Sequence, residues 1–131
     1  MTPTKDIKDI EDFKDIKKMV DIFYGKVRKD NLIGPIFNDK IQNHWPEHLA
    51  KLYSFWQGIL LGEKTYTGFP FPPHAQLPIS KEHFDRWLAL FTETVDCLFV
   101  GPIANEAKNR AYKIADIFQD KLAYIRNKAN K

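Results

Sequence analysis

Histidine side chains are the first candidates for chemistry in this chain of 131 residues, because an imidazole can bind a metal or carry a proton near neutral pH. His74 stands in the segment Phe69-Pro-Phe-Pro-Pro-His74-Ala-Gln-Leu-Pro78. The prolines before it restrict the backbone, and Pro78 prevents a long helix after it. We therefore expect an imidazole held at a fixed place within a long connection, where functional residues are often found. A metal ligand and a histidine that only braces its loop both fit this pattern.

The other histidines carry weaker signals. His44 and His48 have the spacing of two metal ligands on one helix face. However, Pro46 disfavours helical geometry at the preceding residue, so His44 is expected outside the helix, and no acidic partner completes the motif. His48 lies on an apolar stripe and is expected to face inward, where a core histidine is the commoner interpretation. His83 is expected to be exposed.

Three further side chains could take part in chemistry. Tyr24 falls on or beside an apolar helix face, and a buried hydroxyl needs a hydrogen-bond partner. A core tyrosine bonded to a carbonyl and a hydroxyl that points into a pocket remain open as interpretations. Trp87 lies on a similar face, and its indole N–H requires an acceptor. Cys97 has apolar neighbours and is interpreted as a small core residue, which would make it a poor nucleophile.

These side chains must be positioned by helices, because apolar residues recur at helical spacing in four stretches. The expected helices cover residues 12–29, 45–61, 80–99 and 103–126. Asp12 and Ser80 are suitable caps for the first and third of them. The Gly34-Pro35 pair is interpreted as a turn, and Phe37 after it as a core plug or a wall of a ligand site. The expected fold class is all-α.

Composition limits the remaining possibilities. A hydrophobic fraction of 44% and an aromatic fraction of 14% predict one globular domain over residues 1–131, with flexible ends at 1–11 and 127–131. The net charge of +3 is spread along the chain, which argues against a nucleic-acid surface. The single cysteine and the absence of an apolar run of membrane-spanning length favour a cytoplasmic protein that neither enters nor spans a membrane.

Several motifs together resemble the truncated haemoglobins of group III. The likeness extends over about residues 16–122, and the chain lacks the glycine pairs typical of groups I and II. The motifs that carry it are Ile22-Phe-Tyr-Gly-Lys-Val-Arg-Lys-Asp30, Gly34-Pro-Ile-Phe37, Trp45-Pro-Glu-His48, Phe55-Trp-Gln-Gly-Ile-Leu-Leu-Gly62, His74 with Leu77-Pro78, and Phe84-Asp-Arg-Trp-Leu88.

The resemblance implies a truncated globin fold, which is a two-over-two helical sandwich with helices B and E packed on helices G and H. It implies the cofactor haem b (iron protoporphyrin IX), with His74 as the proximal iron ligand. On the distal side it places Tyr24, His48 and Trp87, and the role of His48 is left open between donating, gating and filling space. The implied apolar haem contacts are Phe23, Phe37, Leu52, Phe55, Trp56, Leu77, Phe84 and Ile114. Candidates for the haem propionates are Lys51, Lys81 and Arg86.

The implied function is binding of oxygen and other diatomic gases, such as nitric oxide and carbon monoxide, at a pentacoordinate haem iron. The alternative is a peroxidase-like or nitric oxide detoxifying enzyme, which would use peroxide or nitric oxide and an unidentified reductase. A third hypothesis, of a different class, is a haem-free helical binding module in which the aromatic residues are only core. Purified protein that is red would decide between the haem protein and the haem-free module.

Overall fold

The computed structural model describes residues 7–62 and 80–129, with side chains described as far as Tyr124. His74 and Leu77 therefore lie outside the described residues. In the described part, the helices are α1 (Phe13–Lys29), α2 (Gly34–Ile41), α3 (Trp45–Leu61), α4 (Lys81–Leu98) and α5 (Pro102–Ala129). None of the helices described is long and apolar enough to cross a membrane.

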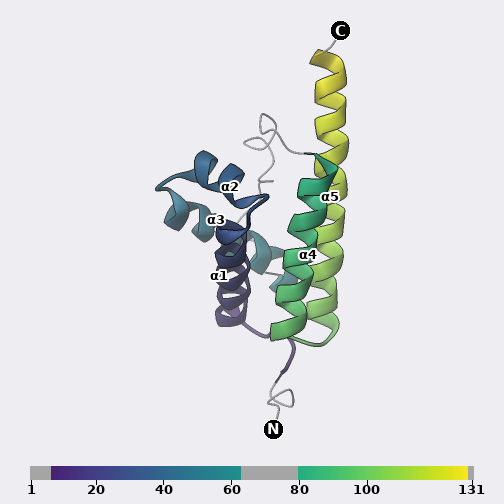
Figure 1. Ribbon diagram of the computed structural model, residues 1–131. Coiled ribbons are helices and arrows are strands. Elements are labelled where there is room, and N and C mark those ends of the chain that lie inside the picture. The colour runs from purple at the N-terminus through teal and green to yellow at the C-terminus, as the bar shows by residue number, and fades with distance from the viewer. Residues whose placement is uncertain (1–6, 63–79, 130–131) are drawn as a thin grey trace.

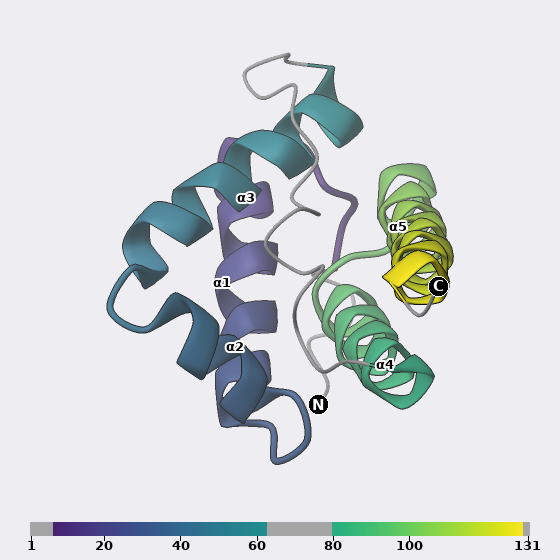
Figure 2. The same ribbon diagram turned by 90° about the horizontal axis from the view of Figure 1, so that it is seen from above.

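The helices form two layers (Figures 1 and 2). In one layer α3 crosses α1, and α2 lies beside one end of α1; in the other layer α4 runs alongside α5 (Figure 2). The core between the layers is built from the apolar stripes of all four long helices, with Phe23, Phe91 and Val95 among its most buried side chains. This arrangement confirms the predicted all-α fold and its two-over-two helical sandwich.

Helix α1 forms where the sequence pattern places it. Asp12 caps it, with a side-chain oxygen that accepts a hydrogen bond of 3.2 Å from the N–H of Asp15. The basic residues Arg28 and Lys29 lie in the last turn, where they complement the negative end of the helix dipole. The predicted apolar face is buried, and it carries Ile16, Met19, Val20, Phe23, Tyr24 and Val27.

The segment after Gly34-Pro35 was predicted as a turn, and this prediction is wrong because residues 34–41 form the helix α2. Proline suits the first turn of a helix, since its missing N–H needs no partner there and its φ is already helical. Gly34 is required for a different reason. A Cβ at this position would lie 2.9 Å from the carbonyl oxygens of Val27 and Arg28, so only glycine lets α2 start this close to α1.

Helix α3 begins at Trp45 with Pro46 in its first turn, and His44 precedes it with non-helical backbone angles, as predicted. Helix α3 ends at Gly62, whose φ of +77° closes the last turn in the left-handed conformation. Ser80 precedes α4, also as predicted. Cys97, in contrast, is exposed, so its assignment to the core is wrong. The buried stripe of α4 passes through Phe91 and Val95, and Cys97 lies off that stripe.

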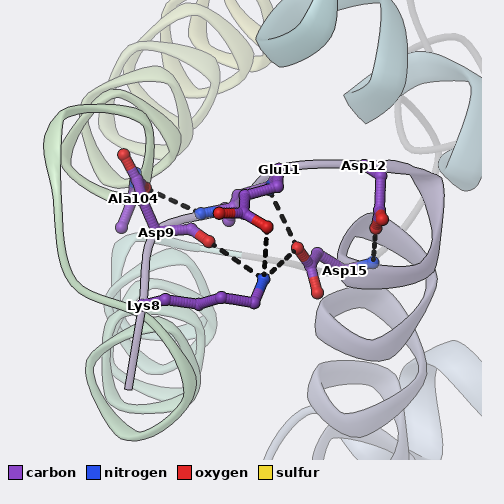
Figure 3. A network of polar contacts seen from close by, with 7 residues as sticks. Lys8, Asp9, Glu11, Asp12, Asp15 and Ala104 are labelled. Atoms are coloured by element: carbon purple, nitrogen blue, oxygen red, sulfur yellow. Dashed lines mark hydrogen bonds and ion pairs between the residues drawn. The ribbon is translucent and has the colours of Figure 1, made fainter. Parts of the chain in front are cut away.

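The segment before α1 packs against the loop between α4 and α5 (Figure 3). The Asp9 carboxylate accepts hydrogen bonds from the N–H groups of Ile10 (2.8 Å), Ile103 (3.0 Å) and Ala104 (2.8 Å). Lys8 pairs with Phe99 in an isolated parallel bridge. Asp9 thus caps the start of α5 from a distant part of the chain, and the flexible end predicted over residues 1–11 stays a prediction.

Candidate ligand pocket

A pocket lies between the two layers, with an empty volume of about 760 Å³ that includes its open side. Cofactor pockets in proteins are mostly apolar, and the wall of this pocket has that character. All five helices contribute to its wall. The lining residues are Tyr24, Ile33, Ile36, Phe37, His48, Leu52, Phe55, Trp56, His83, Phe84, Trp87, Ile114, Ala115 and Phe118.

The pocket brings together most of the residues that the sequence nominated for the site. Those that line it are Tyr24, Phe37, His48, Leu52, Phe55, Trp56, Phe84, Trp87 and Ile114. Phe23 is buried but lies behind the wall, where its ring contacts the rings of Tyr24 at 4.6 Å and Trp87 at 5.6 Å between centroids. Phe23 therefore supports the rings of Tyr24 and Trp87 from behind.

Five lining residues were not nominated from the sequence. Ala115 and Phe118 belong to the apolar stripe of α5, and Ile33 and Ile36 flank the Gly-Pro pair, so helical spacing and position could have found them. His83 was predicted to be exposed, yet it is half-buried and lines the pocket. The reason is its cap: Nδ1 of His83 accepts a hydrogen bond of 2.9 Å from the N–H of Ser80, which holds the ring against the start of α4. In the neutral ring this bond leaves the proton on Nε2.

Tyr24 and Trp87 form the polar centre of the pocket. Tyr24 is 4% exposed, and burial raises the pKa of its hydroxyl to about 12, although a hydrogen bond from Trp87 acts in the opposite direction. Because an indole N–H can only donate, Trp87 is the donor and the Tyr24 oxygen is the acceptor. Tyr24 is therefore a neutral phenol at physiological pH, and its own proton is not used in the bond with Trp87.

Aromatic packing fixes the ring of Trp87. It stacks on Phe91 with an interplanar angle of 11° and a centroid distance of 5.9 Å, and Phe91 in turn stacks on Trp56 at 5.1 Å. Phe23 meets Trp87 edge to face. Such contacts favour one ring orientation, because offset-stacked and edge-to-face geometries are the stable ones for aromatic pairs. These contacts thus hold the Trp87 ring in one orientation within the pocket wall that it shares with Tyr24.

His48 approaches Tyr24 from α3. Its ring lies edge to face with Tyr24 at 6.2 Å and with Trp45 at 5.8 Å between centroids. The predicted inward orientation is confirmed, since His48 is half-buried and lines the pocket. Tyr24, His48 and Trp87 thus come together from three helices. Two of the cations proposed for propionates carry ion pairs: Lys81 with Asp85 and Arg86 with Asp30, both at 2.8 Å.

The chemistry of the wall suits a large, flat, apolar ring. Among the lining residues that the structure describes there is no carboxylate, and the polar ones are one phenol, one indole and two imidazoles. A porphyrin needs apolar contact over both faces, which the aromatic and aliphatic residues of α2, α3, α4 and α5 can supply. The residues present therefore fit a haem.

Comparisons with known proteins agree with this assignment. The family described as bacterial-like globin matches residues 10–120 of the chain. The group 3 truncated haemoglobin ctb of Campylobacter jejuni is 44% identical over 111 residues, which cover 82% of this chain and 87% of that protein. The crystal structure of the group III truncated haemoglobin from Campylobacter jejuni superposes with a TM-score of 0.79 at 41% identity and covers 88% of this chain and 94% of that one.

A match of this extent and identity shows the family of the chain, and globins of this family bind haem. Helices α1, α3, α4 and α5 accordingly correspond to B, E, G and H of the sandwich. The chain belongs to the group III truncated haemoglobins.

Proposed function

We propose that the protein binds haem b through His74 and holds oxygen and other diatomic gases on the side of the haem that faces Tyr24. The observation that supports this most directly is that Tyr24 and Trp87 lie together in the wall of an otherwise mostly apolar pocket. A haem held by His74 alone would supply an open coordination position for a gas. The apolar contacts proposed for the haem include Leu52, Phe84 and Ile114.

Tyr24 and Trp87 have different roles in this proposal. Trp87 donates to the Tyr24 oxygen, which orients the phenol and leaves the Tyr24 proton for a ligand in the pocket. Oxygen held in this pocket by a haem would be a partly negative acceptor, and a hydrogen bond to a charged acceptor contributes about 1.5–3 kcal/mol. We therefore expect Tyr24 to slow oxygen release by about ten- to hundredfold, because each 1.4 kcal/mol corresponds to roughly a factor of ten.

The first experiment replaces Tyr24 by Phe and measures oxygen dissociation from the ferrous protein. Release should become about ten- to hundredfold faster. Tyr53→Phe is a matched control, since Tyr53 donates its hydroxyl proton to Asp21 and is not part of the pocket wall. An unchanged rate in Tyr24→Phe would remove Tyr24 from the mechanism.

The second experiment tests the iron ligand. Replacing His74 by Ala should abolish or greatly weaken haem binding, and the visible absorption spectrum reports it directly. If the spectrum of His74→Ala matched that of the unaltered protein, His74 would not be the ligand. A protein that stayed colourless after addition of hemin would contradict the haem-binding function itself.

A second candidate function is supported by the two imidazoles in the wall, His48 and His83. Imidazoles near a reacting group can transfer protons, as a peroxidase-like reaction requires, and nitric oxide detoxification would use the same pocket. Turnover with peroxide and with nitric oxide, compared with oxygen binding alone, distinguishes the enzyme from the carrier. The reductase partner and the cytoplasmic location remain predictions from the sequence.

A further inference from the structure

The end of α1 is tied to α4 by an ion pair. Asp30 follows α1, and one oxygen of its carboxylate accepts hydrogen bonds of 3.0 Å from the N–H groups of both Leu32 and Ile33. The other oxygen accepts a hydrogen bond of 2.8 Å from Nε of Arg86 in α4. The Asp30 side chain is only 7% exposed, whereas that of Arg86 is 49% exposed. One carboxylate thus holds both the turn before α2 and the neighbouring helix.

The two partners are adjacent to the walls of the pocket. Arg86 immediately precedes Trp87, and Asp30 binds the backbone of Ile33, which lines the pocket. Tyr24 lies on the same helix that Asp30 ends. The ion pair therefore connects the helix that carries Tyr24 with the helix that carries Trp87.

We propose that the Asp30–Arg86 ion pair positions α4 against α1 so that Trp87 can donate its hydrogen bond to Tyr24. Asp30 and Arg86 are positioning residues in this proposal, and they act on the gas ligand only through Tyr24 and Trp87. The proposal rests on the proposed function, in which Tyr24 hydrogen-bonds to the ligand.

Hydrogen-bond geometry explains why such a contact matters. A hydrogen bond weakens steeply as its angle or distance departs from the optimum, whereas apolar packing is not directional. The stacked rings of Trp87, Phe91 and Trp56 favour one ring orientation, but apolar packing constrains the height of α4 relative to α1 less strictly than a hydrogen bond does. A short bond to a nearly buried carboxylate can set that height, because a buried carboxylate without its cation is costly.

A second ion pair between the same helices provides a comparison. Nζ of Lys26 lies 3.1 Å from Oε1 of Glu93, and their side chains are 33% and 61% exposed. Neither residue lines the pocket or neighbours Trp87. Because exposed pairs contribute little to stability, loss of this one should leave the pocket unchanged. Lys26→Gln is therefore a matched control for Arg86→Gln.

The experiment uses the haem-loaded protein and the four variants Arg86→Gln, Asp30→Asn, Lys26→Gln and Tyr24→Phe, with Trp87→Phe added only to assign a resonance. Oxygen dissociation should become about two- to tenfold faster in Arg86→Gln, because the bond from Trp87 is weakened rather than removed. Asp30→Asn should have a similar effect, and Lys26→Gln should have none. If Asp30→Asn failed to fold, Arg86→Gln alone would still test the proposal, since it leaves the bonds of Asp30 to the turn in place.

A second readout is independent of gas release. The indole N–H proton of Trp87 in the carbon monoxide form should shift upfield in Arg86→Gln and Asp30→Asn, because a weaker hydrogen bond deshields the proton less. The shift should not change in Lys26→Gln. The assignment of this resonance follows from its disappearance in Trp87→Phe.

The possible outcomes separate the two levels of the hypothesis. If Tyr24→Phe releases oxygen faster while Arg86→Gln matches the unaltered protein in both readouts, the positioning proposal is refuted and the proposed function stands. If Tyr24→Phe itself has no effect, the proposed function fails. If Arg86→Gln loses haem faster but Asp30→Asn does not, Arg86 acts as a propionate partner, and this result also overturns the positioning proposal.

Discussion

Asp9 performs the task of a helix cap that the local sequence of α5 lacks. Gly101 precedes α5 and has no side chain, so it cannot accept hydrogen bonds from the first N–H groups of the helix. The Asp9 carboxylate, more than ninety residues away, accepts those of Ile103 and Ala104 instead (Figure 3). A cap residue contributes about 0.5–2 kcal/mol. We therefore expect Asp9→Ala to lower the free energy of unfolding by about 1–2 kcal/mol, with the upper part of that range favoured by the third bond, to Ile10.

Gly101 makes room for this contact. Its φ is +141°, and a Cβ there would lie 2.5 Å from Cγ and Oδ2 of Asp9. Gly101→Ala should thus strain the backbone and displace the carboxylate, which predicts a loss of about 1–3 kcal/mol. Both substitutions break one contact, so the double variant should lose less than the sum of the single losses, with a coupling of at least about 0.5 kcal/mol.

Denaturant unfolding of the haem-loaded protein at one fixed haem concentration measures these losses, because bound cofactor itself adds to the apparent stability. For a chain of this size, 1–2 kcal/mol corresponds to a decrease in Tm of about 3–8 °C. Asp12→Ala is a reference, since Asp12 is an ordinary cap with one bond, to the N–H of Asp15. Additive losses for Asp9→Ala and Gly101→Ala, or a loss in Asp9→Ala below that of Asp12→Ala, would refute the reasoning.

Two further predictions concern stability. Gly25→Ala should raise the free energy of unfolding by about 0.5–1 kcal/mol, because a Cβ there meets open space within a helix. Gly34→Ala should lower it by about 1–3 kcal/mol, because its Cβ would press on two carbonyl oxygens. Denaturant unfolding measures both changes, and the reverse order would contradict the packing argument. Burial alone would raise the pKa of the Asp9 and Asp30 carboxyls, but hydrogen bonds from backbone N–H groups outweigh it and hold each pKa below its usual value. Since the folded pKa lies below the unfolded value of about 3.9, this stabilisation is present above that pH and is lost as the pH falls further, so acid titration of unfolding should show a smaller slope below about pH 4 in Asp9→Ala.

The sequence was sufficient for the long helices and for most of the pocket wall. The apolar stripes of α1, α3, α4 and α5 can be read from the local spacing of apolar residues. The stripe of each helix must face the core, whatever the exact packing of the helices. This is why Tyr24 and Trp87, on different helices, could both be predicted to face inward. Helix α2 was missed because Gly34-Pro35 is typical of a turn when nothing shows that the glycine is needed for close approach to α1.

Other features could not be predicted because they depend on contacts between distant residues. Asp9 looked like part of a polar terminus, since nothing near it in the sequence indicates the N–H groups that it binds. His83 looked like a surface residue of a first helical turn, and only its bond with Ser80 turns the ring toward the pocket. Cys97 was misplaced for the opposite reason, because apolar neighbours in sequence do not lie on one side of a helix.

In this fold, apolar contacts supply most of the stability, and hydrogen bonds between distant residues fix the relative positions of the helices. Apolar burial holds the layers together, but it is not directional and leaves small displacements of one helix along another as a remaining freedom. Hydrogen bonds between residues that are far apart in the sequence remove that freedom. Asp9 binds the start of α5, and the Asp30–Arg86 pair positions α4 against α1. The walls of the pocket belong to these same helices. A hydrogen bond such as that between Trp87 and Tyr24 tolerates only small displacements, so its alignment must come from directional contacts outside the pocket.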